Sequence, residues 1–199
     1  MANADITPFK PITKEAEDIL NQIIRQKELA LLLNTQLFCV VLGPAEHSHL
    51  HALRIKCRDH IRALKHHAFF PEELTEEDIN RRLIELHIDE HRREAFTSDR
   101  SSLNNFLITS SDLIFILAAG QGALIEFGKY IGPVPHKIKS FVAEKEYHPE
   151  SLLSHEAKSV ASLNPDCVLT YKEESEIFAQ IKKCLVLELR KKLRSVSNG

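Results

Sequence analysis

The chain has 199 residues, 43% of them hydrophobic and 27% charged, a composition typical of a soluble globular protein; it excludes collagen, disordered chains and coiled-coil fibres. The net charge of −2 creates no field strong enough to attract nucleic acid by electrostatics alone. The N-terminus lacks the features of a signal peptide, and no apolar stretch approaches the length of a membrane span, so we expect a cytoplasmic protein. Four widely spaced cysteines without a Cys-x-x-Cys motif predict buried, reduced thiols.

The N-terminal third of the chain predicts a helix followed by a strand. After a tail over residues 1–12, apolar residues recur at helical spacing from Thr13 to about Leu33, which predicts an amphipathic helix outside the sheet. This helix could supply an interface if the chain is a structural protein in a larger assembly, and a homo-oligomer is also possible. The dense apolar run from Leu37 to Leu42 then predicts a strand buried on both faces, because continuous β-prone sequence is typical of parallel sheets.

A βαβ unit and a charged insertion come next. Helical spacing returns over residues 48–65 and leads to a short second strand, 68–70, which ends at Pro71. The segment 72–97 is highly charged but keeps an apolar stripe, so it predicts a surface helix or helix pair inserted after the second strand.

Three further strands are predicted at 113–117, 138–142 and 167–171, before a closing helix from Glu174 to about Leu193. The third strand leads through residues 118–122 into a helix over 123–130. Strands that alternate with helices, without an internal repeat or a long linker, predict one α/β domain over residues 13–199. We expect three layers with a mainly parallel, five-stranded sheet.

Three loops that follow strands are candidates for a ligand site, because open parallel sheets bind ligands outside the carboxyl ends of their strands. These are residues 43–47, 71–73 and 120–122, which we expect to converge on one edge. Only 6 of the 199 residues are glycine, and two of them flank Gln121, so a ligand could approach the backbone at Gly120-Gln121-Gly122. A plain tight turn explains the same pattern. Residue 125 is isoleucine, so the third glycine of a dinucleotide fingerprint is missing.

Glu126 is a carboxylate between Ile125 and Phe127 in the first turns of the helix that follows this loop. Burying a carboxylate costs free energy unless it is hydrogen-bonded or faces a cleft. One interpretation is a nucleophile, or a charge that stabilises a developing sugar cation. The other is a surface carboxylate that neutralises the helix N-terminus or pairs with a lysine.

Basic residues on the helix over 48–65 are further candidates. Arg54 and Arg58 lie one turn apart and could hold a phosphate bidentately, although Arg58 and Asp59 also fit a pair of solvated surface charges. His47 and His51 share a helical face, but no His-Glu-x-x-His motif accompanies them, so we expect no metal site and no cofactor.

The pattern Gly-x-x-x-Glu-x-Gly over residues 122–128, preceded by a strand that begins with Ser111-Asp112, resembles the nucleoside 2-deoxyribosyltransferases and their relatives in the wider TIR-like fold. Leu42-Gly43-Pro44 is similar to the end of the first strand in that family. The resemblance covers residues 36–44 and 110–130, and it implies a flavodoxin-like or TIR-like architecture. It also implies that Glu126 is the catalytic glutamate and that Gly128 allows close helix packing.

The activity implied by the resemblance is cleavage or transfer of the N-glycosidic bond of a nucleoside or nucleotide; TIR-like relatives cleave NAD. Family members usually hold the sugar with an aspartate just before the first glycine of the motif, where this chain has Gly120 and Gln121. A phosphorylated substrate fits this difference. A nucleotide sensor that has lost catalysis and contacts a partner protein through its 72–97 helix fits it as well.

The candidate site residues are therefore Glu126 for catalysis and a larger set for substrate binding. That set comprises Gly43, Pro44, Glu46, His47, Arg54, Arg58, Asp112, Gly120, Gln121 and Gly122.

Overall fold

The computed structural model describes Lys14 and residues 34–44, 48, 50–85, 87–89, 105–106, 108–118, 128–130, 133–144 and 165–197. The chain divides into two compact units, and the unit from Gln36 to Glu188 contains the whole sheet. The other unit comprises Met1–Thr35 and Leu189–Gly199. The predicted N-terminal tail and, apart from Lys14, the predicted helix to Leu33 lie outside the described residues.

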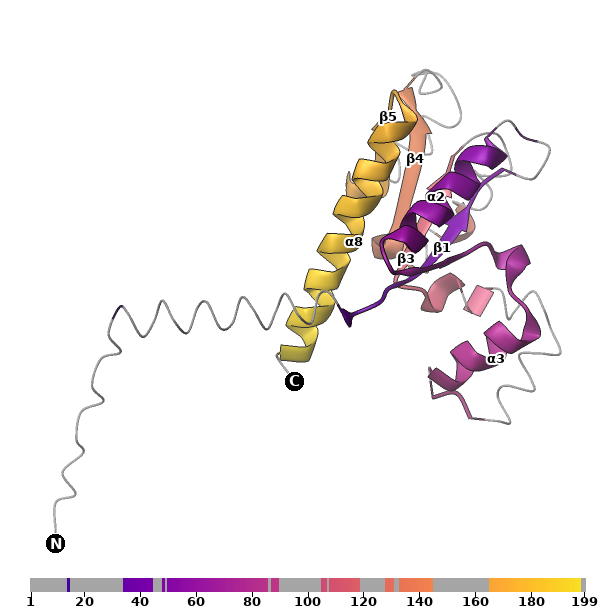
Figure 1. Ribbon diagram of the computed structural model, residues 1–199, viewed down its shortest axis with the longest axis vertical. Coiled ribbons are helices and arrows are strands. Elements are labelled where there is room, and N and C mark those ends of the chain that lie inside the picture. The colour runs from indigo at the N-terminus through magenta and orange to yellow at the C-terminus, as the bar shows by residue number, and fades with distance from the viewer. Residues whose placement is uncertain are drawn as a thin grey trace, which may run out of the picture. The chain divides into compact units, whose positions relative to one another are not determined.

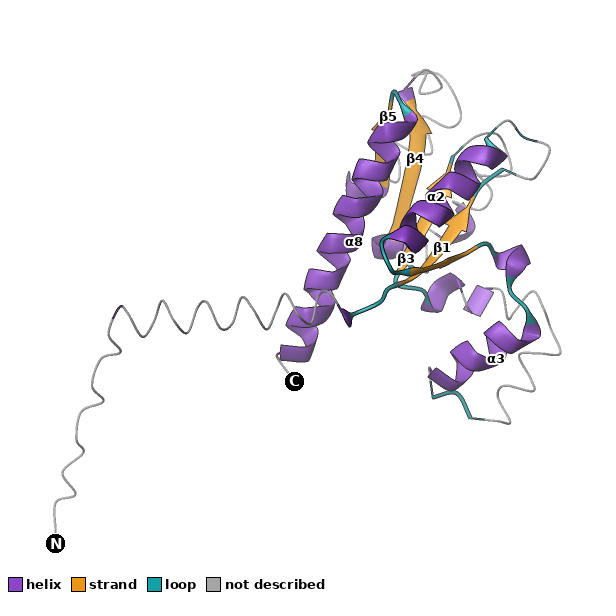
Figure 2. Cartoon of the chain, in the orientation of Figure 1, coloured by secondary structure: helices purple, strands orange, loops and turns teal. Residues whose placement is uncertain are grey.

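The sheet-containing unit alternates strands with helices (Figures 1 and 2). In chain order the elements are β1 (Phe38–Leu42), α2 (His51–Ala63), β2 (His67–Phe69), η1 (Pro71–Glu73), α3 (Glu76–Glu85), β3 (Leu113–Leu117), η2 (Pro135–Lys137), β4 (Ile138–Ala143), η4 (Pro165–Cys167), β5 (Val168–Tyr171) and α8 (Glu174–Ser197). All five predicted strands are confirmed, with ends that differ by at most one residue. The charged segment after β2 begins with the single turn η1 and continues as α3.

The helix α2 ends two residues earlier than predicted, for a reason that the local sequence did not indicate. Lys65 has a φ of +66° and so takes the left-handed conformation that usually requires glycine at a helix end. The amide of Lys65 donates to Arg62 O at 2.9 Å, and the amide of His66 donates to Ile61 O at 3.3 Å. These two bonds form a Schellman motif, which turns the chain toward β2.

The five strands form one sheet in the order β2-β1-β3-β4-β5, and every neighbouring pair is parallel. This confirms the predicted α/β class. From β1 the chain first adds β2 on one side and then crosses to add β3 on the other. The β1–β3 boundary is therefore the topological switch point, where ligands of open α/β sheets bind.

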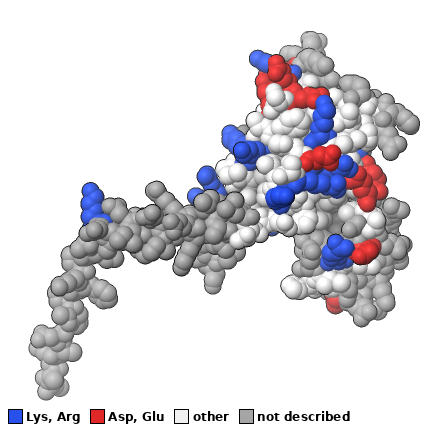
Figure 3. All heavy atoms as spheres, viewed as in Figure 1, with Lys and Arg blue, Asp and Glu red and all other residues white. Residues whose placement is uncertain are grey.

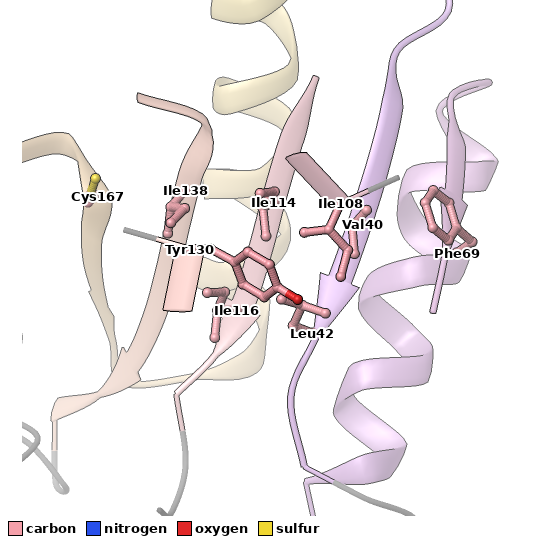
Figure 4. Close-up of a cluster of buried hydrophobic side chains, with 9 residues drawn as sticks. All are labelled: Val40, Leu42, Phe69, Ile108, Ile114, Ile116, Tyr130, Ile138 and Cys167. Carbon is pink, nitrogen blue, oxygen red and sulfur yellow. The ribbon is translucent and has the colours of Figure 1, made fainter. Parts of the chain in front are cut away.

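Both faces of the sheet are covered. Side chains of alternating strand residues point to opposite faces, and Figure 4 shows one face, where Ile108 and Tyr130 pack on strand side chains. The cluster on this face comprises Val40, Leu42, Phe69, Ile108, Ile114, Ile116, Tyr130, Ile138 and Cys167. The helices α2 and α8 lie behind the sheet in that view, on the face that carries the stacked rings of Phe115 and Phe141. The three predicted layers are therefore present.

The two helices on that face also contact each other. The ring of His60 on α2 lies 5.0 Å from that of Phe178 on α8, and Lys56 Nζ lies 2.7 Å from Glu174 Oε2. Among the described helices, none combines the length and the apolar character needed to cross a membrane.

Candidate functional site

Gly43 lies at the switch point, directly after β1 and beside the end of β3. Its φ is +154°, which side chains rarely tolerate. A Cβ added at Gly43 would lie 3.1 Å from the Cβ of Leu117 and 3.5 Å from its carbonyl oxygen. Conformation and close approach thus both require glycine here, and the residue lies at the carboxyl edge of the sheet, where the sequence placed it.

Arg54, on the second turn of α2, joins the ends of two strands at this edge. Its side chain is only 4% exposed. Nε and Nη2 donate to the carbonyl oxygen of Val41 on β1, at 3.3 and 3.1 Å. Nη1 and Nη2 also donate to the two carboxylate oxygens of Glu72, which follows β2, at 2.5 and 3.0 Å. The guanidinium carbon lies 4.1 Å from the centre of the Phe70 ring, within cation–π range.

The charge of Arg54 alters the acidity of its partner. Partial burial of Glu72 acts to raise the pKa of its carboxyl group, but the hydrogen bonds and the positive charge of Arg54 outweigh it and lower that pKa. Glu72 is therefore ionised at neutral pH, and it neutralises a cation that α2 buries against the sheet.

Arg58 lies one turn further along α2 and contacts the same ring, with its guanidinium carbon 4.7 Å from the centre of Phe70. It pairs with Glu73, and its Nη2 lies 2.8 Å from Asp59 Oδ1. The side chain of Arg58 is 15% exposed and that of Asp59 is 56% exposed, so the arginine is more enclosed than a solvated surface charge. Cationic and anionic side chains accordingly adjoin one another over α2 in Figure 3.

His51, the first residue of α2, belongs to the same cluster. Its ring centre lies 6.5 Å from that of Phe70, and its charge contributes to the lowered pKa of Glu72. Its Nδ1 atom is buried and, among the described residues, has no hydrogen-bond partner. His51, Arg54 and Arg58 are spaced i, i+3 and i+7, so helical periodicity could have grouped them. Sequence reasoning considered His51 only as a metal ligand, placed Glu72 within the candidate loop 71–73 without a role of its own, and assigned no role to Phe70.

The described residues contain no group of three or more histidine, cysteine, aspartate or glutamate side chains arranged to hold a metal ion. The cluster around Arg54 is instead one of ion pairs and ring contacts.

Asp112 lies at the amino ends of the strands, opposite the carboxyl edge that carries Gly43 and Arg54. Its Oδ2 accepts a hydrogen bond from the amide of Phe38 at 2.8 Å, and its own amide donates to the carbonyl oxygen of Phe38 at 2.7 Å. Both residues precede or begin their strands, and the amino ends of parallel strands share one edge. The structure therefore places Asp112 away from Gly43 and Arg54, where it joins the beginnings of β1 and β3.

The remaining predicted residues are only partly placed. Pro44 follows Gly43 and is partly exposed. Six predicted residues lie outside the described part of the chain: Glu46, His47, Gly120, Gln121, Gly122 and Glu126. Gly128 lies in the described helical stretch 128–130, and no described atom lies within 4 Å of a Cβ added there. The packing role that the family resemblance implies for Gly128 thus gains no support from the described residues.

Comparison of the chain with protein-family models, curated proteins and solved structures finds no match. The resemblance to nucleoside 2-deoxyribosyltransferases rests on the sequence motifs alone.

Proposed function

We propose that the protein binds a nucleoside or nucleotide at the carboxyl edge between β1 and β3 and cleaves or transfers its N-glycosidic bond. The observation that carries this proposal is Gly43, whose backbone closely approaches Leu117 at the switch point of the sheet. Because β3 ends at Leu117, the glycine-rich sequence that leads to Glu126 leaves the sheet at this same edge. Fold position and sequence motif therefore both favour this edge for the proposed ligand.

In this proposal the carboxylate of Glu126 attacks the anomeric carbon or stabilises positive charge that develops there. The bond between that carbon and the base nitrogen breaks, and the base leaves with the electron pair and takes up a proton. Water completes a hydrolysis, or an acceptor base completes a transfer. Backbone amides around Gly120 and Gly122 would orient the sugar or its phosphate.

The direct test is incubation of the purified full chain with NAD and a panel of nucleosides and nucleotides, followed by chromatography for released base. Glu126→Gln and Glu126→Ala should abolish release and leave ligand binding largely intact. The matched control is Glu77→Gln on α3, because Glu77 is 85% exposed and pairs only weakly with Arg81, at 3.3 Å. Unchanged turnover in the Glu126 variants would contradict the catalytic assignment.

A nucleotide sensor without catalysis is the second candidate. It is favoured by Ile84, which is 57% exposed on the charged helix α3 and so offers an apolar contact to a partner protein. For a sensor, one nucleotide should raise the melting temperature while no base is released. Release of base by the wild type, lost in the Glu126 variants, would exclude this alternative.

A further inference from the structure

The ion pair between Arg54 and Glu72 is asymmetric in its exposure to solvent. The Arg54 side chain is 4% exposed, whereas the Glu72 side chain is 57% exposed. An arginine cannot discharge itself by losing a proton, so its buried guanidinium needs an anion beside it. The cation of this pair is thus built into the sheet edge, and the anion lies on its solvent side.

The cation is held in place independently of that anion. Two hydrogen bonds to Val41 O and the contact with the Phe70 ring fix the guanidinium against β1 and the end of β2. The carboxylate, in contrast, belongs to the single turn η1, which follows β2, the outermost strand of the sheet. Glu72 can therefore leave Arg54 without breaking any pairing between strands.

The arrangement has the form of an oxyanion site. Two nitrogens of Arg54 meet two oxygens of Glu72, and this bidentate geometry is the one that guanidinium groups also form with phosphate. Arg58 contacts the same ring and adds a second guanidinium nearby, which is itself paired with Glu73 and Asp59. Arg54 also lies beside Gly43, since a Cβ added at Gly43 would be 3.7 Å from Arg54 Cδ. The pair is thus adjacent to the proposed ligand edge.

We infer that Arg54 and Arg58 form a phosphate subsite in which the chain's own Glu72 occupies the place of the anion, so that a phosphorylated ligand binds in competition with Glu72. This inference deepens the proposed function and rests on it for the nature of the ligand. It names a nucleotide, rather than an unphosphorylated nucleoside, as the substrate class.

Competition from a tethered carboxylate makes the phosphate affinity of the wild type weak, because the local concentration of Glu72 is high. Glu72→Gln removes the negative charge, keeps the size of the side chain and leaves the buried guanidinium without its counter-ion. Inorganic phosphate and AMP should then bind at least about tenfold more tightly than to the wild type, because charge-assisted bidentate bonds replace the lost pair. The affinity for adenosine should not change.

The test is isothermal titration calorimetry of the full chain with inorganic phosphate, AMP and adenosine. Glu77→Gln serves as the control, since it removes the same charge from an exposed position on α3. The gain in phosphate affinity should disappear when Arg54→Lys is added to Glu72→Gln, because lysine cannot bind two oxygens in parallel. Equal phosphate affinities in Glu72→Gln and Glu77→Gln would overturn the inference.

A measurement on the wild type covers the case in which Glu72→Gln does not fold. Phosphate titration followed by NMR at the arginine Nε–H groups should shift the signal that is missing in Arg54→Lys, and an unmoved signal at saturating phosphate counts against the subsite. The two proposals can fail separately. If Glu72→Gln binds phosphate more tightly but the protein releases no base, only the proposed activity is refuted. If the protein cleaves AMP but Glu72→Gln binds phosphate no more tightly than the wild type, only the competition with Glu72 is refuted.

Discussion

Gly43→Ala is the substitution whose consequence follows most directly from the structure. The residue has a φ of +154°, and an added Cβ would meet the Cβ of Leu117 at 3.1 Å. A third neighbour, Arg54 Cδ at 3.7 Å, would be in ordinary van der Waals contact and cost nothing. The perturbation therefore has two sources, backbone strain and overlap with β3.

The free-energy costs of the strain and of the overlap can be estimated separately. A residue with a side chain in a sparsely populated region of positive φ costs about 1–3 kcal/mol. Crowding at 3.1 Å requires a shift of a few tenths of an ångström, and Leu117 is part of a buried central strand. Overpacking of this kind costs about 1 kcal/mol at its lower end. A total of about 2–4 kcal/mol corresponds to a fall of about 4–16 °C in the melting temperature for a chain of this length.

The assay is thermal unfolding followed by circular dichroism, with Gly128→Ala as the control. A Cβ at Gly128 meets no described atom within 4 Å, and alanine in a helix is favoured over glycine by up to about 1 kcal/mol. The control should therefore melt at the temperature of the wild type or slightly above it. If Gly43→Ala also retains the wild-type melting temperature, the close approach of β1 to β3 at this point is refuted.

Two further predictions concern titratable groups. Burial, with a contribution from the charge of Glu174, raises the pKa of the Cys57 thiol to about 12, so roughly one thiol in ten thousand is ionised at pH 8. Iodoacetamide should leave Cys57 unmodified in the folded protein at pH 8 and alkylate it in guanidinium chloride; rapid alkylation without denaturant would contradict its burial. The second prediction concerns His66. Its pKa is lowered from 6.5, chiefly by burial and further by the charge of His67, and its Nδ1 accepts a hydrogen bond from the amide of Leu37 at 3.3 Å. Because His66 binds a proton more tightly in the unfolded chain than in the folded one, its neutral form contributes to the free energy of unfolding. This contribution is complete above pH 6.5 and is lost as the pH falls toward the lowered pKa. In urea unfolding at pH 7.5 and 5.5, His66→Asn, which keeps an acceptor, should lose less stability on acidification than the wild type; an equal loss would assign the pH dependence to other groups.

Local sequence sufficed for the strands and for the place of Gly43 after the first of them, and it also named Arg54 and Arg58 as candidates. The run Leu113–Leu117 is buried throughout as β3 because five consecutive apolar residues suit a strand covered on both faces. Gly43 was a candidate because it directly follows a predicted strand and because Leu42-Gly43-Pro44 resembles the end of the first strand in the deoxyribosyltransferases. These features are encoded by residues that are neighbours along the chain, so periodicity and residue type reveal them.

Tertiary structure decided the partners at the sheet edge. Arg54 and Glu72 are separated by 18 positions. The sequence predicted that the loop 71–73 lies at the same edge as residues 43–47, but it did not predict that these two side chains pair across β1 and β2. Asp112 was expected near the ligand, but it precedes β3 and binds the amide of Phe38 at the amino edge. Which side chains share an edge depends on strand order and strand direction, and these are set by the packing of helices on both faces of the sheet. For this reason the sequence indicated a ligand edge near Gly43 and named Arg54 as a candidate, whereas the burial of its guanidinium and its pairing with Glu72 became visible only in the folded chain.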